Sequence, residues 1–366
     1  MREYLLLLVI VAAVTYLATP LARAWALRAK AMASVRDRDV HDQPTPRWGG
    51  LAMLAGLLSA YLVAGELPLL RRVFEGGGEV RAILIGAVII CLLGMADDLW
   101  EIDALTKLAG QALAASVVVV QGVQLLWLPI NGVIALPPVI GPLITIAIIV
   151  VTINAVNFVD GLDGLAAGIV AIAGLSLFGF SYLLAVVYGF SRAGTPTFIT
   201  AALIGMCIGF LPHNVNPARI FMGDSGSMLL GLLLASAAIT LTGQLDGNAV
   251  RAENLVPTLL PLLLPFAVLA VPLVDLFFAV VRRTAAGRSP FAPDKQHLHH
   301  RLLEIGHSHR RAAMIMYIWT ALLALPVTAA AFWPTRWVLV GTFVAFLVAL
   351  VVTFRISTID TEQVNQ

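Results

Sequence analysis

Two acidic residues, Asp97 and Asp98, close a long apolar run, and Lys107 follows shortly after them in the sequence. Neighbouring carboxylates at the boundary of a lipid bilayer repel each other and persist only where a cation offsets their charge. Lys107 is close enough along the chain to return to the same surface, and a bound metal ion is the other candidate cation. A solvated helix end is the simpler alternative for this pair.

A second polar cluster lies in the sequence NAVNFVDGLDGLAAG (154–168), where Asn157, Asp160 and Asp163 recur at intervals of three. If a helix continues through this stretch, the three side chains share one face. If the chain breaks at the glycines, they line a loop that membrane depth tolerates only around a polar cavity. Amide and carboxylate oxygens are the ligands that Mg²⁺ prefers. Helix capping accounts for one or two polar residues, but not for the four that this stretch holds once Asn154 is included.

The sequence FMGDSGS places Asp224 and Ser225 in a glycine-flanked turn directly before another apolar run. Asp224 could cap the helix that begins there. It could equally bind Mg²⁺, which takes one or two protein ligands together with substrate phosphates. A helix N-terminus close by also favours phosphate. Taken alone, this motif is better explained by capping.

The sequence DKQHLHHRLL gathers His297, His299, His300 and Arg301 within a few residues. A zinc site is disfavoured because no cysteine accompanies the histidines and adjacent histidines point apart. Together with the basic residues just before them, these side chains predict a loop that binds an anion such as a diphosphate. Contact between a basic surface loop and lipid headgroups is the alternative.

A further acid, Asp275, falls inside an apolar run, about two helical turns before Arg282. An ionisable residue at membrane depth is a functional-site candidate by default. An internal ion pair with the arginine is an equally good structural account.

These polar clusters are exceptions in a chain of 366 residues that is 60% hydrophobic and only 12% charged, with a mean hydropathy of +0.92. Such a composition excludes an ordinary soluble domain. It predicts a polytopic membrane protein, since each crossing needs about 20 apolar residues. The net charge of +2 says little about partners. Cys91 and Cys207 lie in apolar segments and give neither a disulfide framework nor a metal-binding spacing.

We predict an all-α polytopic membrane protein of about eleven transmembrane helices in one domain over 1–355, followed by a short cytoplasmic tail over 356–366. The spans are expected at 4–22, 49–65, 81–97, 104–122, 139–157, 163–188, 196–212, 226–242, 256–281, 311–332 and 336–354. The first is interpreted as a retained helix, because no convincing cleavage site follows it. The stretch 121–139 is interrupted by proline and Asn-Gly, which predicts a short extracytoplasmic hairpin rather than a span.

Lysine and arginine residues concentrate in two loops, one after the first predicted span and one after the ninth. Cytoplasmic loops of membrane proteins carry such an excess of positive charge. These two loops and the C-terminal tail are therefore predicted to be cytoplasmic, and the N-terminus to lie outside. In this topology the loops that hold the polar clusters fall on the same side. One composite site at the cytoplasmic surface is the natural interpretation.

The motifs ADD…LTKLAGQ, NAVNFVDGLDGLAAG, ARIFMGDSGS and HLHH follow one another in this order. With them the chain, from residue 36 to about residue 304, closely resembles the polyprenyl-phosphate N-acetylhexosamine-1-phosphate transferases. That superfamily includes the bacterial phospho-N-acetylmuramoyl-pentapeptide transferase and the eukaryotic dolichyl-phosphate GlcNAc-1-phosphate transferase. The resemblance implies transfer of a sugar 1-phosphate from a UDP-sugar to a polyprenyl phosphate, expected to be undecaprenyl phosphate. The products are a polyprenyl diphosphate-sugar and UMP.

The resemblance also implies a role for each motif. Asp97 and Asp98 match the catalytic acid pair, one of which, expected to be Asp97, deprotonates or orients the lipid phosphate. Lys107 matches a lysine that holds phosphate, and Asn157 and Asp224 match proposed Mg²⁺ ligands. The residues expected to bind substrate are Arg47, Asp160, Asp163, His297, His299, His300 and Arg301.

Two polyanionic substrates must meet in such a site, so a divalent cation and basic side chains are needed to offset their charge. Mg²⁺ is the expected cofactor, with Mn²⁺ as an alternative because both accept oxygen ligands. The expected partners are the UDP-sugar, the polyprenyl phosphate and the lipid bilayer, with no nucleic acid; a homodimer is compatible with the sequence. The resemblance implies the bacterial cytoplasmic (inner) membrane, with the active site facing the cytoplasm.

The first cytoplasmic loop discriminates between branches of this superfamily. Muramoyl-pentapeptide enzymes typically have a lysine at the position of Asp42, whereas the sequence DVHDQPTPRWGG, with His41 and Arg47, resembles the branch that uses UDP-GlcNAc. The His-x-His-His pattern and an eleventh span point the same way. We therefore predict transfer of GlcNAc 1-phosphate, the priming step of cell-wall or surface polysaccharide synthesis. The muramoyl-pentapeptide donor or another N-acetylhexosamine is the alternative.

An ion-coupled transporter and an intramembrane aspartyl protease are rival interpretations from other classes. A transporter would carry acids near mid-membrane on several helices, often within inverted repeats. Here Asp275 alone is intramembrane, and no internal repeat is visible. The protease chemistry needs two aspartates facing each other at membrane depth, whereas Asp224 lies in a predicted loop. The clustering of acids at one surface favours the transferase.

Overall fold

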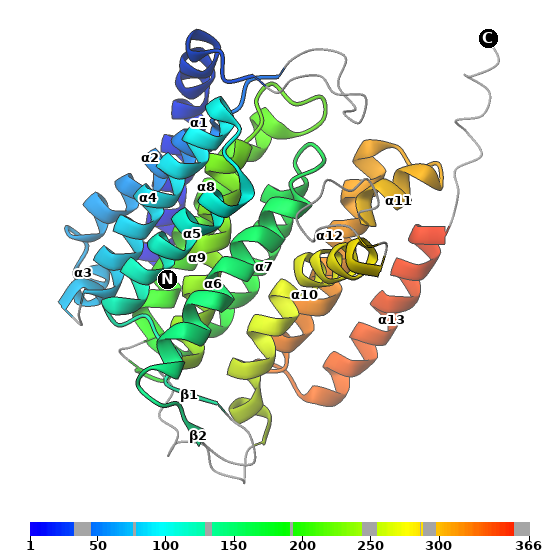
Figure 1. Ribbon diagram of the computed structural model, residues 1–366. Helices are drawn as coiled ribbons and strands as arrows, with labels where there is room; N and C mark the ends of the chain where they lie inside the picture. The colour runs from blue at the N-terminus through cyan, green and yellow to red at the C-terminus, as the bar shows by residue number, and fades with distance from the viewer. Residues whose placement is uncertain are drawn as a thin grey trace.

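Where an apolar chain meets lipid, every backbone N–H and C=O must be satisfied internally, which favours helices. The computed structural model is accordingly a bundle of long helices, most of which run in roughly the same direction or its opposite (Figure 1). It describes residues 1–32, 45–75, 78–128, 134–190, 193–243, 255–285, 287 and 298–354.

The elements follow one another in a simple order, with one short pair of strands between helices. They are α1 (Arg2–Ala29), α2 (Gly49–Ala64), α3 (Pro68–Glu75), α4 (Glu79–Trp100), α5 (Ala104–Val120), β1 (Trp127–Leu128), β2 (Ile134–Ala135), α6 (Ile140–Val159), α7 (Leu165–Tyr182), the π-helix η1 (Leu183–Val187), α8 (Gly194–Asn214), α9 (Gly223–Gly243), α10 (Leu255–Ala285), α11 (Leu298–Glu304), α12 (His309–Ala329) and α13 (Thr335–Phe354).

Each of the eleven predicted spans overlaps a long helix, and the prediction of an all-α polytopic membrane protein is confirmed. Among the described residues, eight helices are long and apolar enough to cross a bilayer, or nine if α2 and α3, which meet at 105°, are counted as one span. The apolar helix α5 has only 17 residues. The count of eleven crossings therefore stays a prediction.

The strands β1 and β2 pair in antiparallel fashion within the stretch expected to form a hairpin. Trp127 lies opposite Ala135, and Leu128 lies opposite Ile134. The pair is at the end of the bundle opposite α11 (Figure 1). This pairing is what a hairpin requires, although the residues that connect the strands are outside the described ranges. Its location outside the cytoplasm stays a prediction.

The polar stretch between α6 and α7 breaks the helix. Asp160 follows the last residue of α6 and is non-helical, with φ −76° and ψ 53°. Gly164 precedes α7 with φ 76°, a left-handed conformation that glycine adopts without strain. The alternative in which one helix continues from Asn157 through Asp163 is therefore wrong. These side chains are carried by a helix end and by the tight turn after it, residues 160–164.

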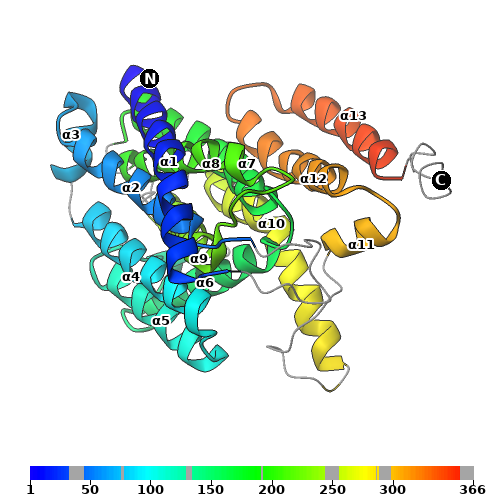
Figure 2. The ribbon, with the colours of Figure 1, turned by 90° about the horizontal axis from the view of Figure 1, so that it is seen from above.

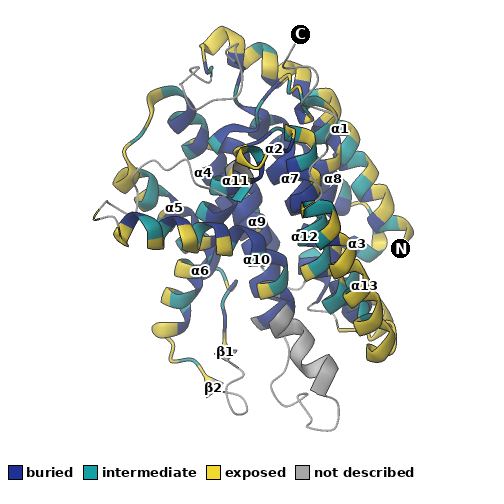
Figure 3. Ribbon diagram, turned by 90° about the vertical axis from the view of Figure 1, so that its right-hand side faces the viewer, coloured by how far each residue is buried: buried dark blue, intermediate teal, exposed yellow. Residues whose placement is uncertain are grey.

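Helix α9 forms the centre of the bundle, where it packs against α2, α4, α6 and α8 (Figure 2). Almost all of its residues are buried, as expected for a helix that is apolar on every side. Helix α13 is the opposite case, because it packs beside α12 and leaves most of its side chains exposed (Figure 3). The start of α9 is therefore enclosed by neighbouring helices.

Two glycines let neighbouring helices reach the start of α9. A Cβ atom on Gly50 of α2 would lie 2.3 Å from the backbone of Ser225 and Gly226. A Cβ atom on Gly94 of α4 would lie 2.3 Å from the backbone nitrogen of Ser225. The backbone at Ser225 is thus held between α2 and α4, which fixes the position of the preceding residue, Asp224.

A second, separate hydrophobic cluster joins the turn 160–164 to the C-terminal helices. Its buried members include Val159 and Leu162 at the turn, Leu302 of α11, and Ile315 and Met316 of α12. Helices α11 and α12 therefore pack against the end of α6 and the turn that follows it.

Candidate active site

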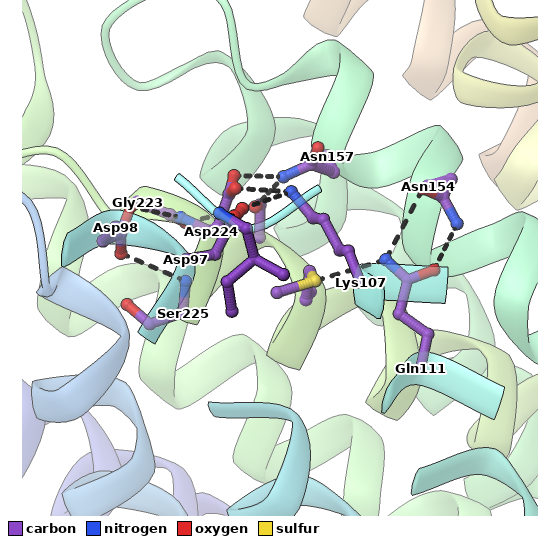
Figure 4. Close-up of polar contacts among 12 residues, drawn as sticks. Asp97, Asp98, Lys107, Gln111, Asn154, Asn157, Gly223, Asp224 and Ser225 are labelled. Atoms are coloured by element: carbon purple, nitrogen blue, oxygen red, sulfur yellow. Dashed lines mark hydrogen bonds and ion pairs between the residues drawn. The ribbon is translucent and has the colours of Figure 1, made fainter. Parts of the chain in front are cut away.

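Lys107 joins two carboxylates that come from different helices. Its Nζ lies 2.7 Å from Oδ2 of Asp97, near the end of α4, and 2.5 Å from Oδ2 of Asp224, in the first turn of α9 (Figure 4). The lysine side chain is only 18% exposed, so its charge is largely removed from water. Ion pairs in such a buried position are screened less than pairs in water. The predicted return of Lys107 to the acid pair is confirmed for Asp97.

The short connection between α4 and α5 fixes where Lys107 points. Glu101 ends α4 in the left-handed conformation, with φ 48°. Oδ1 of Asp97 then accepts a hydrogen bond from the backbone N–H of Ile102 at 2.8 Å. Asp103 caps α5 by accepting hydrogen bonds from two backbone N–H groups of its first turn. Lys107 therefore lies in the first turn of a helix whose start is fixed by its cap.

Asp98 binds a different partner from its neighbour Asp97. Its side chain is fully buried, and its two oxygens accept hydrogen bonds from the backbone N–H groups of Asp224, at 3.1 Å, and Ser225, at 3.4 Å. Arg47 Nη1 lies 3.8 Å from Oδ1. A carboxylate in this position satisfies helix N–H groups and complements the positive end of the helix dipole. The capping function considered for Asp224 is therefore carried out by Asp98, from another helix.

Asn157 reaches the same cluster from the last turn of α6. Its Nδ2 donates to Oδ1 of Asp224 at 2.7 Å and to Oγ of Ser227 at 2.8 Å. The two residues predicted to share a cation, Asn157 and Asp224, are thus in direct contact (Figure 4). Both oxygens of Asp224 are engaged, one by an amide and the other by the Lys107 ammonium.

Asp160 lies in the turn after α6, close enough for the charges of this cluster to change its pKa. Burial raises the pKa of Asp160 to about 8, and the negative charges of Asp224 and Asp98 act in the same direction, while Arg47 opposes them. The described part of the cluster therefore contains more carboxyl groups than cations. An additional cation would offset this excess of negative charge.

Asp163 fastens the turn to the loop between α8 and α9. Its Oδ2 accepts hydrogen bonds from Asn216 Nδ2 and from the backbone N–H of Ala218, both at 3.0 Å. Asn214 ties the same two segments together, because its Oδ1 accepts from the backbone N–H of Gly164 at 3.0 Å. The structure therefore shows Asp163 joining two loops, and its predicted contact with the nucleotide stays a prediction.

A second polar layer lies one turn deeper in the bundle. Gln111 follows Lys107 by one turn on α5, and Asn154 precedes Asn157 by one turn on α6. Their amides exchange hydrogen bonds of 2.6 and 3.5 Å, and Gln111 Nε2 also lies 3.3 Å from Sδ of Met228 in α9 (Figure 4). Because this pair links α5 to α6, it sets the spacing between the helices that carry Lys107 and Asn157.

The histidine motif is only partly described. His297 lies outside the described residues, and so do the side chains of His299 and His300, although their backbone belongs to α11. Arg301 is in α11 and its side chain is exposed. The predicted anion-binding function of these four residues stays a prediction.

Asp275 in α10 has a structural partner at the start of the next helix, α11. It is 1% exposed, and its Oδ1 accepts a hydrogen bond from the backbone N–H of Leu298 at 2.9 Å. Near the end of α10, the guanidinium of Arg283 lies over the ring of Phe158 in α6, 5.1 Å from the ring centroid. Asp275 therefore holds α11 against α10, which accounts for a buried acid at this position without a transport function.

The structure thus unites most of the predicted centre and adds residues that the sequence did not single out. Asp97, Lys107, Asn157 and Asp224 are brought into contact, and Arg47 joins them through Asp98. The additional polar residues are Ser227, Asn214, Asn216 and Gln111. The available signals were the motifs themselves, because Ser227 ends FMGDSGS and Gln111 ends LTKLAGQ, while Asn214 and Asn216 lie just before ARIFMGDSGS.

The oxygens available to a metal ion are few. Among the described residues, no three His, Cys, Asp or Glu side chains are arranged to hold a metal. A divalent cation at this site would therefore rely on Asp224 and Asn157, with water or substrate phosphate completing its shell. This is the usual way in which proteins bind Mg²⁺.

Comparison with known proteins places this geometry in a family. The family model described as glycosyl transferase family 4 matches residues 80–242, which contain Asp97, Lys107, Asn157 and Asp224. The chain is 48% identical over 358 residues, 96% of this chain and 88% of the relative, to the decaprenyl-phosphate N-acetylglucosaminephosphotransferase of Mycolicibacterium smegmatis.

Two more distant relatives come from other bacteria. The probable undecaprenyl-phosphate N-acetylglucosaminyl 1-phosphate transferase of Bacillus subtilis is 32% identical over 308 residues, 82% of this chain and 77% of the relative. The phospho-N-acetylmuramoyl-pentapeptide-transferase of Desulforudis audaxviator is 31% identical over 316 residues, 79% of this chain and 85% of the relative.

A helical membrane bundle with a charged cluster at the helix ends, together with these relatives, defines a membrane-embedded phosphotransferase. The chain belongs to glycosyl transferase family 4, in its branch of polyprenyl-phosphate N-acetylglucosamine-1-phosphate transferases. The predicted superfamily, branch and enzyme class are confirmed.

Proposed function

We propose that this enzyme transfers N-acetylglucosamine 1-phosphate from UDP-N-acetylglucosamine to a polyprenyl phosphate. The products are polyprenyl diphosphate-N-acetylglucosamine and UMP. The observation that carries the proposal is the Lys107 ammonium held between the carboxylates of Asp97 and Asp224. The donor assignment is supported by 48% identity to a relative named for N-acetylglucosamine transfer, against 31% to a muramoyl-pentapeptide relative.

In the proposed reaction, an oxygen of the polyprenyl phosphate attacks the β-phosphorus of the UDP-sugar. The bond from that phosphorus to the oxygen shared with the α-phosphate breaks, and UMP leaves with the electron pair. Both reactants are anions, so the main tasks of the protein are to position them and to offset their charge. Lys107 is suited to this because its charge is partly desolvated and fixed from two sides.

We assign to Asp97 the orientation or deprotonation of the lipid phosphate. One of its oxygens is bound by the Ile102 N–H and the other by Lys107, so the orientation of the carboxylate is fixed before substrate arrives. Asp98 is assigned to positioning instead, because both of its oxygens accept hydrogen bonds from the start of α9. The acid pair thus divides into a catalytic and a positioning member.

Mg²⁺ is the cofactor that these residues fit. Asp224 supplies a carboxylate, and Asn157, whose Nδ2 donates to that carboxylate, supplies an amide oxygen. The cluster also has an excess of acid. When bound there, Mg²⁺ would screen the negative charge of the diphosphate and of the departing UMP. Mn²⁺ accepts the same oxygen ligands.

The acceptor is proposed to be a long polyprenyl phosphate reached from the cytoplasmic side of the bacterial inner membrane. The relative at 48% identity is named for decaprenyl phosphate, and the relative at 32% is named for undecaprenyl phosphate. The cytoplasmic orientation is supported by the basic loops that follow α1 and α10. Such a product would prime the synthesis of a cell-wall or surface polysaccharide.

The proposal is tested with purified full-length protein in detergent and donors labelled in the sugar. UDP-N-acetylglucosamine and UDP-N-acetylmuramoyl-pentapeptide are supplied separately, each with decaprenyl or undecaprenyl phosphate. Labelled lipid is expected from the first donor alone, and its formation should cease with EDTA and return with added Mg²⁺. Product from the muramoyl donor would overturn the donor assignment. Product that persists in EDTA would overturn the metal assignment.

A further inference from the structure

Tyr317 in α12 contacts the polar turn 160–164, although it lies outside every motif and outside residues 80–242. We propose that Tyr317 is a positioning residue that holds this turn in the shape that binds the UDP-sugar. The inference rests on the proposed function, because it concerns the donor of that same reaction.

The contact is made at the residue that reverses the chain. The Tyr317 hydroxyl donates to the backbone carbonyl of Gly164 at 2.6 Å, and the backbone N–H of Gly164 donates to Oδ1 of Asn214 at 3.0 Å. Gly164 has φ 76° and precedes α7, and its carbonyl also accepts a helical hydrogen bond from the backbone N–H of Gly168 at 2.9 Å. The turn that carries Asp160 and Asp163 is therefore held at its last residue from both sides.

The tyrosine ring is positioned by a second glycine, one turn further along α7. A Cβ atom on Gly168 would lie 2.2 Å from Cζ and 2.3 Å from Oη of Tyr317. The ring therefore packs directly on the helix backbone, which leaves the hydroxyl little freedom. Any larger residue at Gly168 would displace Tyr317 and break its bond to Gly164.

Helix α12 also supports the helix with the predicted anion-binding residues. Leu302 of α11 shares a buried cluster with Leu162 of the turn and Met316, the neighbour of Tyr317. The turn and α11 thus rest on the same few residues of α12. Loss of the tyrosine hydroxyl leaves this apolar cluster in place and removes only the polar bond to the turn.

The expected consequence is selective. Asp97, Lys107 and Asp224 belong to α4, α5 and α9, respectively. Among the described residues, no hydrogen bond joins these helices to Tyr317. The turn instead carries Asp160, and through Asp163 it fastens the loop at Asn216. A looser turn should therefore weaken binding of the UDP-sugar and leave the lipid acceptor and the chemical step unchanged.

The test compares Tyr317→Phe with Tyr182→Phe in purified full-length protein. Tyr182 lies at the opposite end of α7, so its substitution removes the same atom far from the turn. Tyr317→Phe should raise KM for UDP-N-acetylglucosamine about three- to tenfold, the range expected for loss of one hydrogen bond. KM for the polyprenyl phosphate, kcat and the melting temperature should match those of Tyr182→Phe.

A second measurement does not depend on turnover. Hydrogen–deuterium exchange of peptides covering residues 160–168 should be faster in Tyr317→Phe than in Tyr182→Phe. If wild-type protein fails to transfer sugar phosphate, the proposed function fails and this exchange still tests the contact. An unchanged KM for the donor, an equal rise in both KM values, or unchanged exchange would each overturn the inference.

Discussion

The acids of this site are held in two different ways. Asp97, Asp98 and Asp224 belong to helices, and each has a close partner in the cluster: Lys107 or the backbone at the start of α9. Asp160 and Asp163 belong to a turn, which is held from outside by the loop after α8 and by α12. The two groups lie side by side but depend on different parts of the fold.

This difference suggests a division of work. The helix-borne acids are fixed by the packing of α9, the most buried helix, and are suited to a reaction that tolerates little displacement. The turn-borne acids depend on a few separate hydrogen bonds, which are easier to break and remake when a substrate enters. Changes in the first group should abolish the reaction, and changes in the second should alter donor affinity.

The largest effect is expected from Lys107→Met. This change removes the cation shared by Asp97 and Asp224, so repulsion between the carboxylates replaces their link. The rate of sugar phosphate transfer should fall by about 10²–10³-fold or more. Lys30→Met, at the exposed end of α1, is the matched control and should keep wild-type activity. Near-normal transfer by Lys107→Met would remove the lysine from the reaction.

The next effect concerns helix capping. Asp98→Ala leaves two N–H groups at the start of α9 without their acceptor, which costs about 1–3 kcal/mol when such groups are buried. Its melting temperature should drop clearly, and transfer should fall with it because Asp224 loses its fixed position. Asp103→Ala removes an exposed cap from α5 and serves as the control. Equal melting temperatures for the two variants would contradict the positioning function of Asp98.

The raised pKa of Asp160 in the turn predicts a pH dependence of the protein's stability. The pKa of Asp160 is raised to about 8 in the folded protein, from an ordinary value of about 3.8. Between these values the folded state holds the proton more tightly, so stability contributed by protonated Asp160 is lost as pH rises towards 8. The melting temperature of wild type should therefore fall more steeply between pH 5 and about pH 8 than that of Asp160→Asn. Parallel curves would argue against a raised pKa.

The smallest effect is expected from Asp163→Asn. The new amide keeps an oxygen that can accept from Asn216 and from the Ala218 N–H, but it lacks the charge that strengthens both bonds. KM for the UDP-sugar should rise by less than about tenfold, with kcat and the melting temperature nearly unchanged. A loss as severe as that of Lys107→Met would erase the distinction between the two groups of acids.

Much of this arrangement could be predicted from the sequence, because two strong physical constraints act locally. Apolar runs in a membrane protein must be helical, so all eleven predicted segments overlap helices. Charges at the ends of such runs need compensation, which led to Lys107 as the partner of Asp97. The motifs that carry Asp97, Asn157 and Asp224 also lie at helix ends that the structure brings together.

What could not be predicted depends on contacts between distant parts of the chain. Asp98 caps a helix that begins more than a hundred residues later, and no local pattern marks an acid that serves another helix. Tyr317 adds a single hydroxyl to a largely apolar stretch of α12. Its hydrogen bond to Gly164 exists only because tertiary packing brings α12 to the turn. The same holds for Asn214, whose partners lie in different loops.

The central claim is that Asp224, bound by Lys107 and Asn157, forms the reaction centre together with a divalent cation. The most direct test measures the initial rate of labelled N-acetylglucosamine 1-phosphate transfer by wild type and Asp224→Asn across a Mg²⁺ titration, with equal melting temperatures verified. The account predicts a rate at least about 100-fold lower in the variant, which added Mg²⁺ does not restore. A variant that transfers at the wild-type rate with the same Mg²⁺ dependence would contradict it.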